Sequence, residues 1–523
     1  MANKYSNHLF ELIKSLSKAE KRYFKVFVNR HTASGSTNNA QILFDAIDKM
    51  TDYDESILIE QFKNSAFVNK FSITKARLYD TILKSLGAFY SEKSKDQLIR
   101  NEIHSIEILF NKSLYKQCHK KLISAKKQAI KYSKNLLLAE LIDWEKKLIE
   151  KDNYQLASVK EIQELTNEVN EVLKTKTLNA DLWELKAILF QKLNKIGRAR
   201  TQEQVNELKL NVDSKIKSIS IPDSEIELNY LFNHIQAAYY FGINDVNSSL
   251  NSVIKTINII EVNPNKFSDE PNVLTSTLTN GVYLALKNKD TDQAQLLFTK
   301  LKKLYQTNKD SGSKDLSLKI KSSLWSIELL LVKLTCDFKQ FDVLFENLKT
   351  LLEENPKKIN SSRLAFLYYN IAHILFIKDE FSEALKWTNK LLNSININQS
   401  QEIYSFAEIL NLFIHLELGN IELVNYSLKS TKRFLKTRDK IFDYEKAILK
   451  FLQKVTSYNF DKYEMDTELE KLVQSLKIVL KNPLENIPIE YFDCLLWAES
   501  KLKNKNLSDL MKNSNQELLH FKF

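Results

Sequence analysis

Apolar residues recur every three or four positions along most of the chain, which is the spacing of an amphipathic helix. Near the start, Leu9, Leu12, Ile13 and Leu16 fall on one helical face. Residues 17–20 then form a capping box, in which a serine and a glutamate satisfy free amides at a helix start. The pattern predicts a second helix over residues 18–29 and an all-α fold.

Further short helices are predicted over residues 42–50 and 56–62, and a longer one over residues 74–90. Together with the first two they predict an N-terminal helical domain over residues 1–95. From about residue 99 the pattern changes to long amphipathic helices in pairs, and we predict a region of stacked helix pairs over residues 96–455. In residues 456–523 the apolar pattern is less regular, and prolines separate the helices. This region is predicted to cap the paired helices.

The clearest internal pattern lies at residues 366–392. A helix with Tyr369 and Ala372 is followed by a polar turn at residues 378–380 and by a second helix with Ala384 and Trp387. Small residues in the two helices allow close approach, while the aromatic residues fill the seam between neighbouring pairs. This stretch resembles a tetratricopeptide repeat.

The second-helix frame recurs elsewhere in degenerate form. Its close-packed site is occupied by Cys118, Ala294, Leu344 and Val424 in turn. The spacing between the later sites exceeds the roughly 34 residues usual for the family, so the helices or turns are expected to be longer. An ordinary all-helical protein with close-packed pairs would also show such frames.

The resemblance implies a right-handed α-solenoid of antiparallel helix pairs, with a concave face that binds a peptide or partner protein. By the same resemblance, Tyr369, His373 and Phe376 would face this groove and contact the partner. The alternative is that these residues simply belong to the hydrophobic core.

Composition narrows the choice of function. The 523 residues include only 7 Gly and 6 Pro, whereas average usage gives roughly 35 and 25. Phosphate-cradling loops need several glycines close together, and serine-hydrolase elbows need flanking ones. Neither pattern occurs, and we expect no cofactor and no catalytic residues. The three widely spaced cysteines and the short apolar runs predict a cytoplasmic protein without a membrane span.

A metal site is the least favoured of the hypotheses that the sequence allows. Cys118 and His119, with His104, form the one local group of soft ligands. Adjacent helical residues diverge by about 100° and cannot both face one metal ion. No metal is therefore expected.

The net charge of +11 lies entirely within residues 1–134. Lys18, Lys21, Arg22 and Lys25 share one side of the second helix, and further lysines follow between residues 112 and 131. Such a display fits the phosphates of nucleic acid or an acidic partner, although a solvated basic surface is the plainer interpretation.

Two functions follow from these patterns. The first is a non-enzymatic scaffold that holds a partner protein or peptide on the concave face of the repeats. The alternative is a nucleic-acid-associated regulator, in which residues 1–134 touch nucleic acid and the repeats act as a sensor. An enzyme whose site leaves no sequence signature is a third class. The oligomeric state is not predicted.

Overall fold

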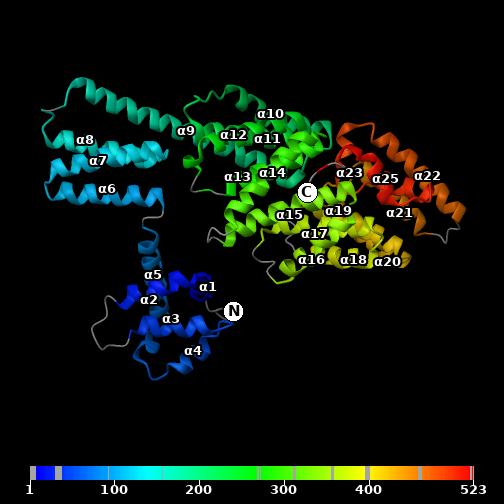
Figure 1. The fold of residues 1–523 in the computed structure, drawn as a ribbon, viewed down its shortest axis with the longest axis horizontal. Coiled ribbons are helices and arrows are strands. Elements are labelled where there is room, and N and C mark those ends of the chain that lie inside the picture. Colours follow the sequence, from blue (N-terminus) through cyan, green and yellow to red (C-terminus); the bar gives the residue numbers. More distant parts are fainter. Residues whose placement is uncertain are drawn as a thin grey trace. The chain divides into compact units, whose positions relative to one another are not determined.

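The computed structural model describes residues 7–29, 38–91, 94–155, 157–267, 270, 272–309, 314–354, 359–394, 401–457, 462–518 and 521. Within these ranges every regular element is helical and no strand occurs, which confirms the all-α prediction (Figure 1). Contacts divide the chain into two compact units, Met1–Leu173 and Lys174–Phe523. None of the helices in the described part combines the length and apolar character that a bilayer crossing needs.

The first unit begins with a small helical bundle around one hydrophobic core. Its elements are α1 (His8–Ser15), α2 (Lys18–Asn29), α3 (Asn39–Lys49), α4 (Glu55–Gln61), the 3-10 turn η1 (Ala66–Lys70) and α5 (Phe71–Tyr90). The predicted capping box is confirmed, because the Ser17 N–H donates to Glu20 Oε2 at 2.6 Å and the Glu20 N–H donates to Ser17 Oγ at 3.3 Å. Phe24 and Phe44 stack at the centre of this bundle.

A second core within the first unit is built by longer helices. These are α6 (Lys95–Asn111), α7 (Tyr115–Lys131), α8 (Asn135–Lys151) and the first part of α9 (Val159–Ile196), which continues into the second unit. The predicted close-packed residue Cys118 is fully buried between α6 and α7. The proposed boundary at residue 95 lies between the two cores of this unit, whereas the contact pattern divides the chain only after Leu173.

The second unit is dominated by helical hairpins. After α10 (Gln202–Ser218), successive partners pack against each other and against the next pair. The pairs are α11 (Ile226–Gly242) with α12 (Val246–Val262), α13 (Asn272–Lys287) with α14 (Thr291–Asn308), α15 (Lys314–Thr335) with α16 (Phe338–Glu354), α17 (Ser361–Ile377) with α18 (Phe381–Ser394), and α19 (Gln401–Glu417) with α20 (Ile421–Lys436). The short turn η2 (Pro264–Lys266) follows α12.

The predicted anchors of these hairpins are buried, with Ala294, Ala384 and Val424 at 0% exposure and Leu344 at 5%. The first helices also pack on one another, α13 on α15, α15 on α17 and α17 on α19. Both α15 and α17 therefore have another first helix on each side.

The C-terminal region returns to these first helices. It comprises α21 (Asp443–Val455), α22 (Lys462–Val479), η5 (Pro483–Asn486), α23 (Ile487–Tyr491), α24 (Cys494–Leu502), α25 (Leu507–Ser514) and η6 (Gln516–Leu518). Here α23 contacts α19, while α25 and η6 contact α15. The C-terminal residues thus pack on first helices of earlier hairpins as well as following the last one.

Several hairpin turns share one geometry that does not depend on glycine. After α17, Asp379 adopts φ 62° and its N–H donates to the Phe376 carbonyl, while the Glu380 N–H donates to the Leu375 carbonyl. This is a Schellman turn, which satisfies two free carbonyls at the helix end. Left-handed residues end other first helices and α7 in the same way, namely Ser113, Ser133, Asn244, Lys289 and Gly419.

Candidate functional site

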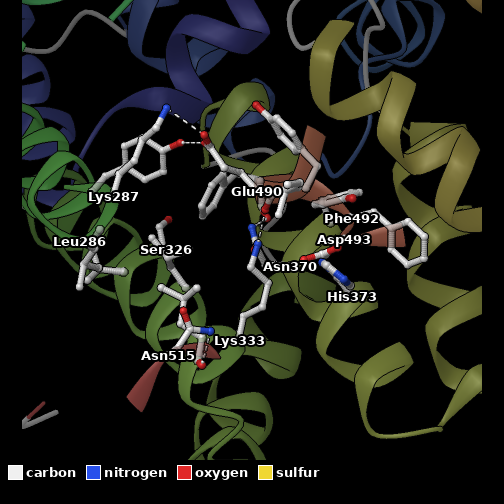
Figure 2. Close-up of a pocket in the computed structure, with 18 of the residues that line it drawn as sticks. Leu286, Lys287, Ser326, Lys333, Asn370, His373, Glu490, Phe492, Asp493 and Asn515 are labelled. Carbon is white, nitrogen blue, oxygen red and sulfur yellow. Dashed lines mark hydrogen bonds and ion pairs between the residues drawn. The ribbon is translucent and has the colours of Figure 1, made fainter. Parts of the chain in front are cut away.

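The second unit contains a cavity of about 1040 Å³. One wall comes from α13, α15 and α17, and the other from α23 with the residues that follow it and from α25 and η6. In Figure 2 the side chains of Leu286, Ser326 and His373 surround an open space beside Glu490 and Phe492. This volume is slightly above the range of about 300–1000 Å³ that is typical of ligand sites.

The segment of residues 486–493 is fixed firmly against the hairpins. The Tyr491 ring stacks on Phe406 of α19, with ring centroids 4.5 Å apart. The Tyr444 hydroxyl donates to the Phe492 carbonyl at 2.7 Å and accepts from the Cys494 N–H at 2.9 Å. The Phe492 side chain packs on the rings of His373, Phe376 and Phe413. One wall of the cavity is therefore held by both hydrogen bonds and aromatic packing.

Glu490 is the centre of the charge network in this wall. Its carboxylate accepts two hydrogen bonds from Arg198, at 2.9 and 2.7 Å, and pairs with Lys287 Nζ at 2.8 Å. The Tyr283 hydroxyl donates to the same carboxylate at 2.7 Å. Burial alone would raise the pKa of Glu490, but Arg198 and Lys287 lower it to about 2. Glu490 is thus an anion whose charge is already compensated.

Lys333 of α15 lies beside this network. Its side chain is buried, and Nζ donates to the backbone carbonyl of Glu490 at 2.9 Å. Burial lowers the pKa of Lys333 to about 8, and the nearby Glu490 carboxylate limits that shift. A buried ammonium with a neutral carbonyl as its partner is less well compensated than Lys287.

Three neighbouring side chains of α17 carry polar atoms without a partner among the described residues. These atoms are Tyr369 Oη, Asn370 Oδ1 and His373 Nδ1. Burial, reinforced by the charge of Lys333, lowers the pKa of His373 well below its usual value, so its ring is neutral. Because buried polar groups are normally hydrogen-bonded, this cluster is unusual.

Arg363 lines the cavity from the first turn of α17. Its backbone N–H bonds to the Asn360 side chain, but no acceptor among the described residues meets its guanidinium. Burial lowers the pKa of Arg363. The side chain is nevertheless a permanent cation, since an arginine remains protonated in proteins.

The three groove residues expected from the repeat resemblance have different positions. Tyr369 and His373 line the cavity, whereas Phe376 lies deeper and packs on Phe381 and Phe492. Their exposures are 2%, 4% and 1% in the order of the chain. Contact with a partner through these residues remains a prediction.

The basic residues expected on the second helix are only partly available. Lys18 and Arg22 are exposed, but Lys21 and Lys25 pair with Asp48 and Asp45 of α3, at 2.6 and 2.7 Å. Two of the four charges are therefore already balanced within the bundle. The metal interpretation gains nothing, because Cys118 is buried while His104 and His119 are exposed.

Lys333, Arg363 and Glu490 line the cavity but were not predicted from the sequence. For Lys333 a signal was present, since it is the one charge within the apolar run of residues 329–336. Arg363 has no such signal because it sits among polar residues at a helix start. Glu490 acquires its role from partners far away in sequence, which periodicity does not report.

No known protein family matches any part of this chain, and no curated protein sequence matches it. The cavity, its charges and the exposed lysines of the first unit are therefore the features that indicate a function.

Replacing Tyr369 and Tyr444 separately with phenylalanine should have different effects on the free energy of unfolding. Tyr369→Phe removes a hydroxyl without a protein partner and should leave the free energy of unfolding unchanged or slightly higher. Tyr444→Phe removes the two hydrogen bonds that its buried hydroxyl makes to the Cys494 N–H and the Phe492 carbonyl. At about 0.5–1.5 kcal/mol for each bond, it should lower the free energy of unfolding by about 1–3 kcal/mol. Urea denaturation followed by circular dichroism measures both. A loss above about 1 kcal/mol for Tyr369→Phe would show that its hydroxyl is bonded.

Glu490→Gln should lower the free energy of unfolding by about 3–5 kcal/mol at pH 7, because it leaves Arg198 buried without its counter-ion. Glu490 has a folded pKa of about 2, below the value of about 4.3 expected in the unfolded chain. Its contribution is therefore complete above about pH 5 and disappears as the pH falls toward 2. The difference between wild type and variant should shrink over that interval. Glu517→Gln, which breaks the exposed pair with Lys289, is the control and should change little.

Proposed function

We propose that this chain is a non-enzymatic interaction scaffold whose second unit holds a segment of a partner protein. In this proposal α11 to α20 form a tetratricopeptide-like α-solenoid, and the partner segment enters the cavity between its first helices and the C-terminal region. The buried thiols of Cys118, Cys336 and Cys494 support a reducing, cytoplasmic location.

The arrangement of the hairpins supports a repeat stack. Second helices pack on their own first helix and, in most pairs, on the next one, as α12 does on α13 and α18 on α19. Schellman turns after α11, α13, α17 and α19, together with the buried anchors, give most hairpins a similar local geometry. Stacked repeats share a core between neighbours and leave a long inner face for binding.

The cavity is the observation that carries the proposal. It is lined by first helices of three consecutive pairs, which is the side on which a repeat stack binds its ligands. Its lining combines apolar residues such as Leu330 and Phe366 with polar atoms that have no partner. Ligand sites have this composition, because apolar area supplies affinity and a few polar groups fix orientation.

Asn280 gives access to the cavity for a direct test, since it is exposed on α13 and also lines the cavity. A photoreactive benzoylphenylalanine at position 280 of the full chain should crosslink one predominant protein from native lysate, through one defined peptide. Asn280→Trp should lower capture of the same protein by about tenfold, equivalent to about 1.4 kcal/mol, because the ring obstructs the cavity.

Asn425, exposed on α20 and remote from the cavity lining, provides the matched control for both changes. The same crosslinked proteins at positions 280 and 425 would refute the proposal. So would recovery of general RNA-associated proteins alone.

A second candidate function, contact with nucleic acid, is favoured by one face of α7. Lys116, Lys120, Lys127 and Lys131 are exposed, and no described carboxylate pairs with them. At about 100° per residue they fall within a 60° arc, opposite the buried residues of the helix. Their neighbours Lys121 and Lys126 are instead paired with glutamates. We call these four lysines the α7 stripe.

If the α7 stripe contacts phosphates, a short DNA or RNA duplex should bind the full chain with an affinity that falls steeply as salt rises. Changing all four lysines to glutamine should reduce the slope of log affinity against log salt by roughly three to four. Fluorescence anisotropy of a labelled duplex measures this. The control replaces Lys429, Lys432 and Lys436 on α20. An unchanged slope, or no binding at low salt, would eliminate the second candidate.

A further inference from the structure

The charges around the cavity do not balance. Lys287 pairs with Glu490, and Lys289 pairs with Glu517. The remaining acid of the lining, Asp493, accepts from the Leu496 N–H at 2.9 Å and caps α24, and burial raises its pKa. Every carboxylate that lines the cavity is thus already committed to a partner within the chain.

Arg363 is the cation left over. It is partly buried, and its guanidinium has no hydrogen-bond or ion-pair partner among the described residues. Withdrawing a guanidinium from water without a counter-ion is unfavourable, and an anion in the cavity would relieve that cost. Its planar set of donors suits a carboxylate or a phosphate, which it can bind through two parallel hydrogen bonds.

The unsatisfied atoms lie further along the same helix. Tyr369, Asn370 and His373 follow Arg363 by six to ten residues, which is about 9–15 Å at 1.5 Å per residue. Between the two ends the lining is mostly apolar, with Phe366 on α17 and Leu330 and Leu334 on α15. The buried ammonium of Lys333 lies near the distal end, as the effect of its charge on the His373 pKa indicates.

We propose that the cavity binds an organic anion: a carboxylate or phosphate group meets Arg363, an apolar body follows, and a hydrogen-bonding group reaches Tyr369, Asn370 and His373. The inference shares its site with the proposed function and rests on it for the source of the anion, an acidic side chain of the partner segment. A free organic acid has the same chemistry and is distinguished by the test.

Two fluorescent probes that differ in charge test the role of Arg363 on the full chain. 8-Anilinonaphthalene-1-sulfonate carries an anionic group on an apolar body, and N-phenyl-1-naphthylamine is its neutral counterpart. Arg363→Met should weaken binding of the sulfonate by at least about tenfold, as the loss of a charge-assisted contact implies. Binding of the neutral probe should not change. Arg363→Lys should retain part of the affinity, because it keeps the charge without the planar donors.

Arg433→Met, at an exposed arginine of α20, is the matched control. Circular dichroism checks that each variant is folded, which we expect because removal of Arg363 breaks no hydrogen bond of its side chain. Equal sulfonate affinity in wild type and Arg363→Met would overturn the inference. So would an equal loss of both probes, since charge would then play no part.

Displacement of the sulfonate separates the two sources of the anion. A capped nonapeptide with one glutamate between leucines should displace it if the anion belongs to a protein segment. Citrate should displace it at lower concentration than the peptide if the ligand is a free organic acid. Either result supports the anion site. The two fluorescent probes bind without a partner protein, so the anion site can be tested separately from the scaffold. If no crosslink forms at position 280 but probe binding depends on Arg363, only the scaffold proposal is refuted.

Discussion

The buried arginine–glutamate network at the start of the second unit is the interaction on which the remainder of that unit depends. Arg200 donates to Glu445 at 2.9 and 3.0 Å and to Glu485 at 2.5 Å, and Arg198 holds Glu490. Both arginines follow α9, whereas their partners lie 245 to 292 residues later. Breaking a buried pair of this kind is strongly destabilising, because it leaves a charge without compensation. The network therefore fixes where the C-terminal residues meet the connection between α9 and α10.

The same network shapes the cavity. Glu490 belongs to α23, which forms one wall, and Glu485 accepts from the backbone N–H groups of Asp443 and Tyr444 at the start of α21. Tyr444 in turn holds the Phe492 carbonyl. A single chain of contacts thus runs from Arg200 to the cavity lining. A wall held in this way is preorganised, and a ligand does not have to order it on binding.

The sequence was sufficient to predict features that local periodicity and turn chemistry determine. These include the helix start at Lys18, the polar turn around Asp379 and the burial of Ala384. It was not sufficient for the insertion of residues 486–493. Pro483 and Pro488 interrupt the pattern there, and a helix of five residues has no period to detect. Those residues were expected only to cap the last hairpin. Arg363 was missed for a related reason, since its burial comes from distant elements.

The contrast between Glu490 and Arg363 explains why the cavity can be both rigid and selective. Glu490 is paired with Arg198 and Lys287 and accepts a hydrogen bond from Tyr283, so its charge stabilises the cavity wall. Arg363 lies on the opposite wall, on α17, and contributes nothing to that network. A charged group that stabilises the fold is not free to bind a ligand, because its hydrogen-bonding positions are already taken by other residues. In the proposed anion site, Glu490 therefore holds the wall in place and Arg363 binds the anionic group.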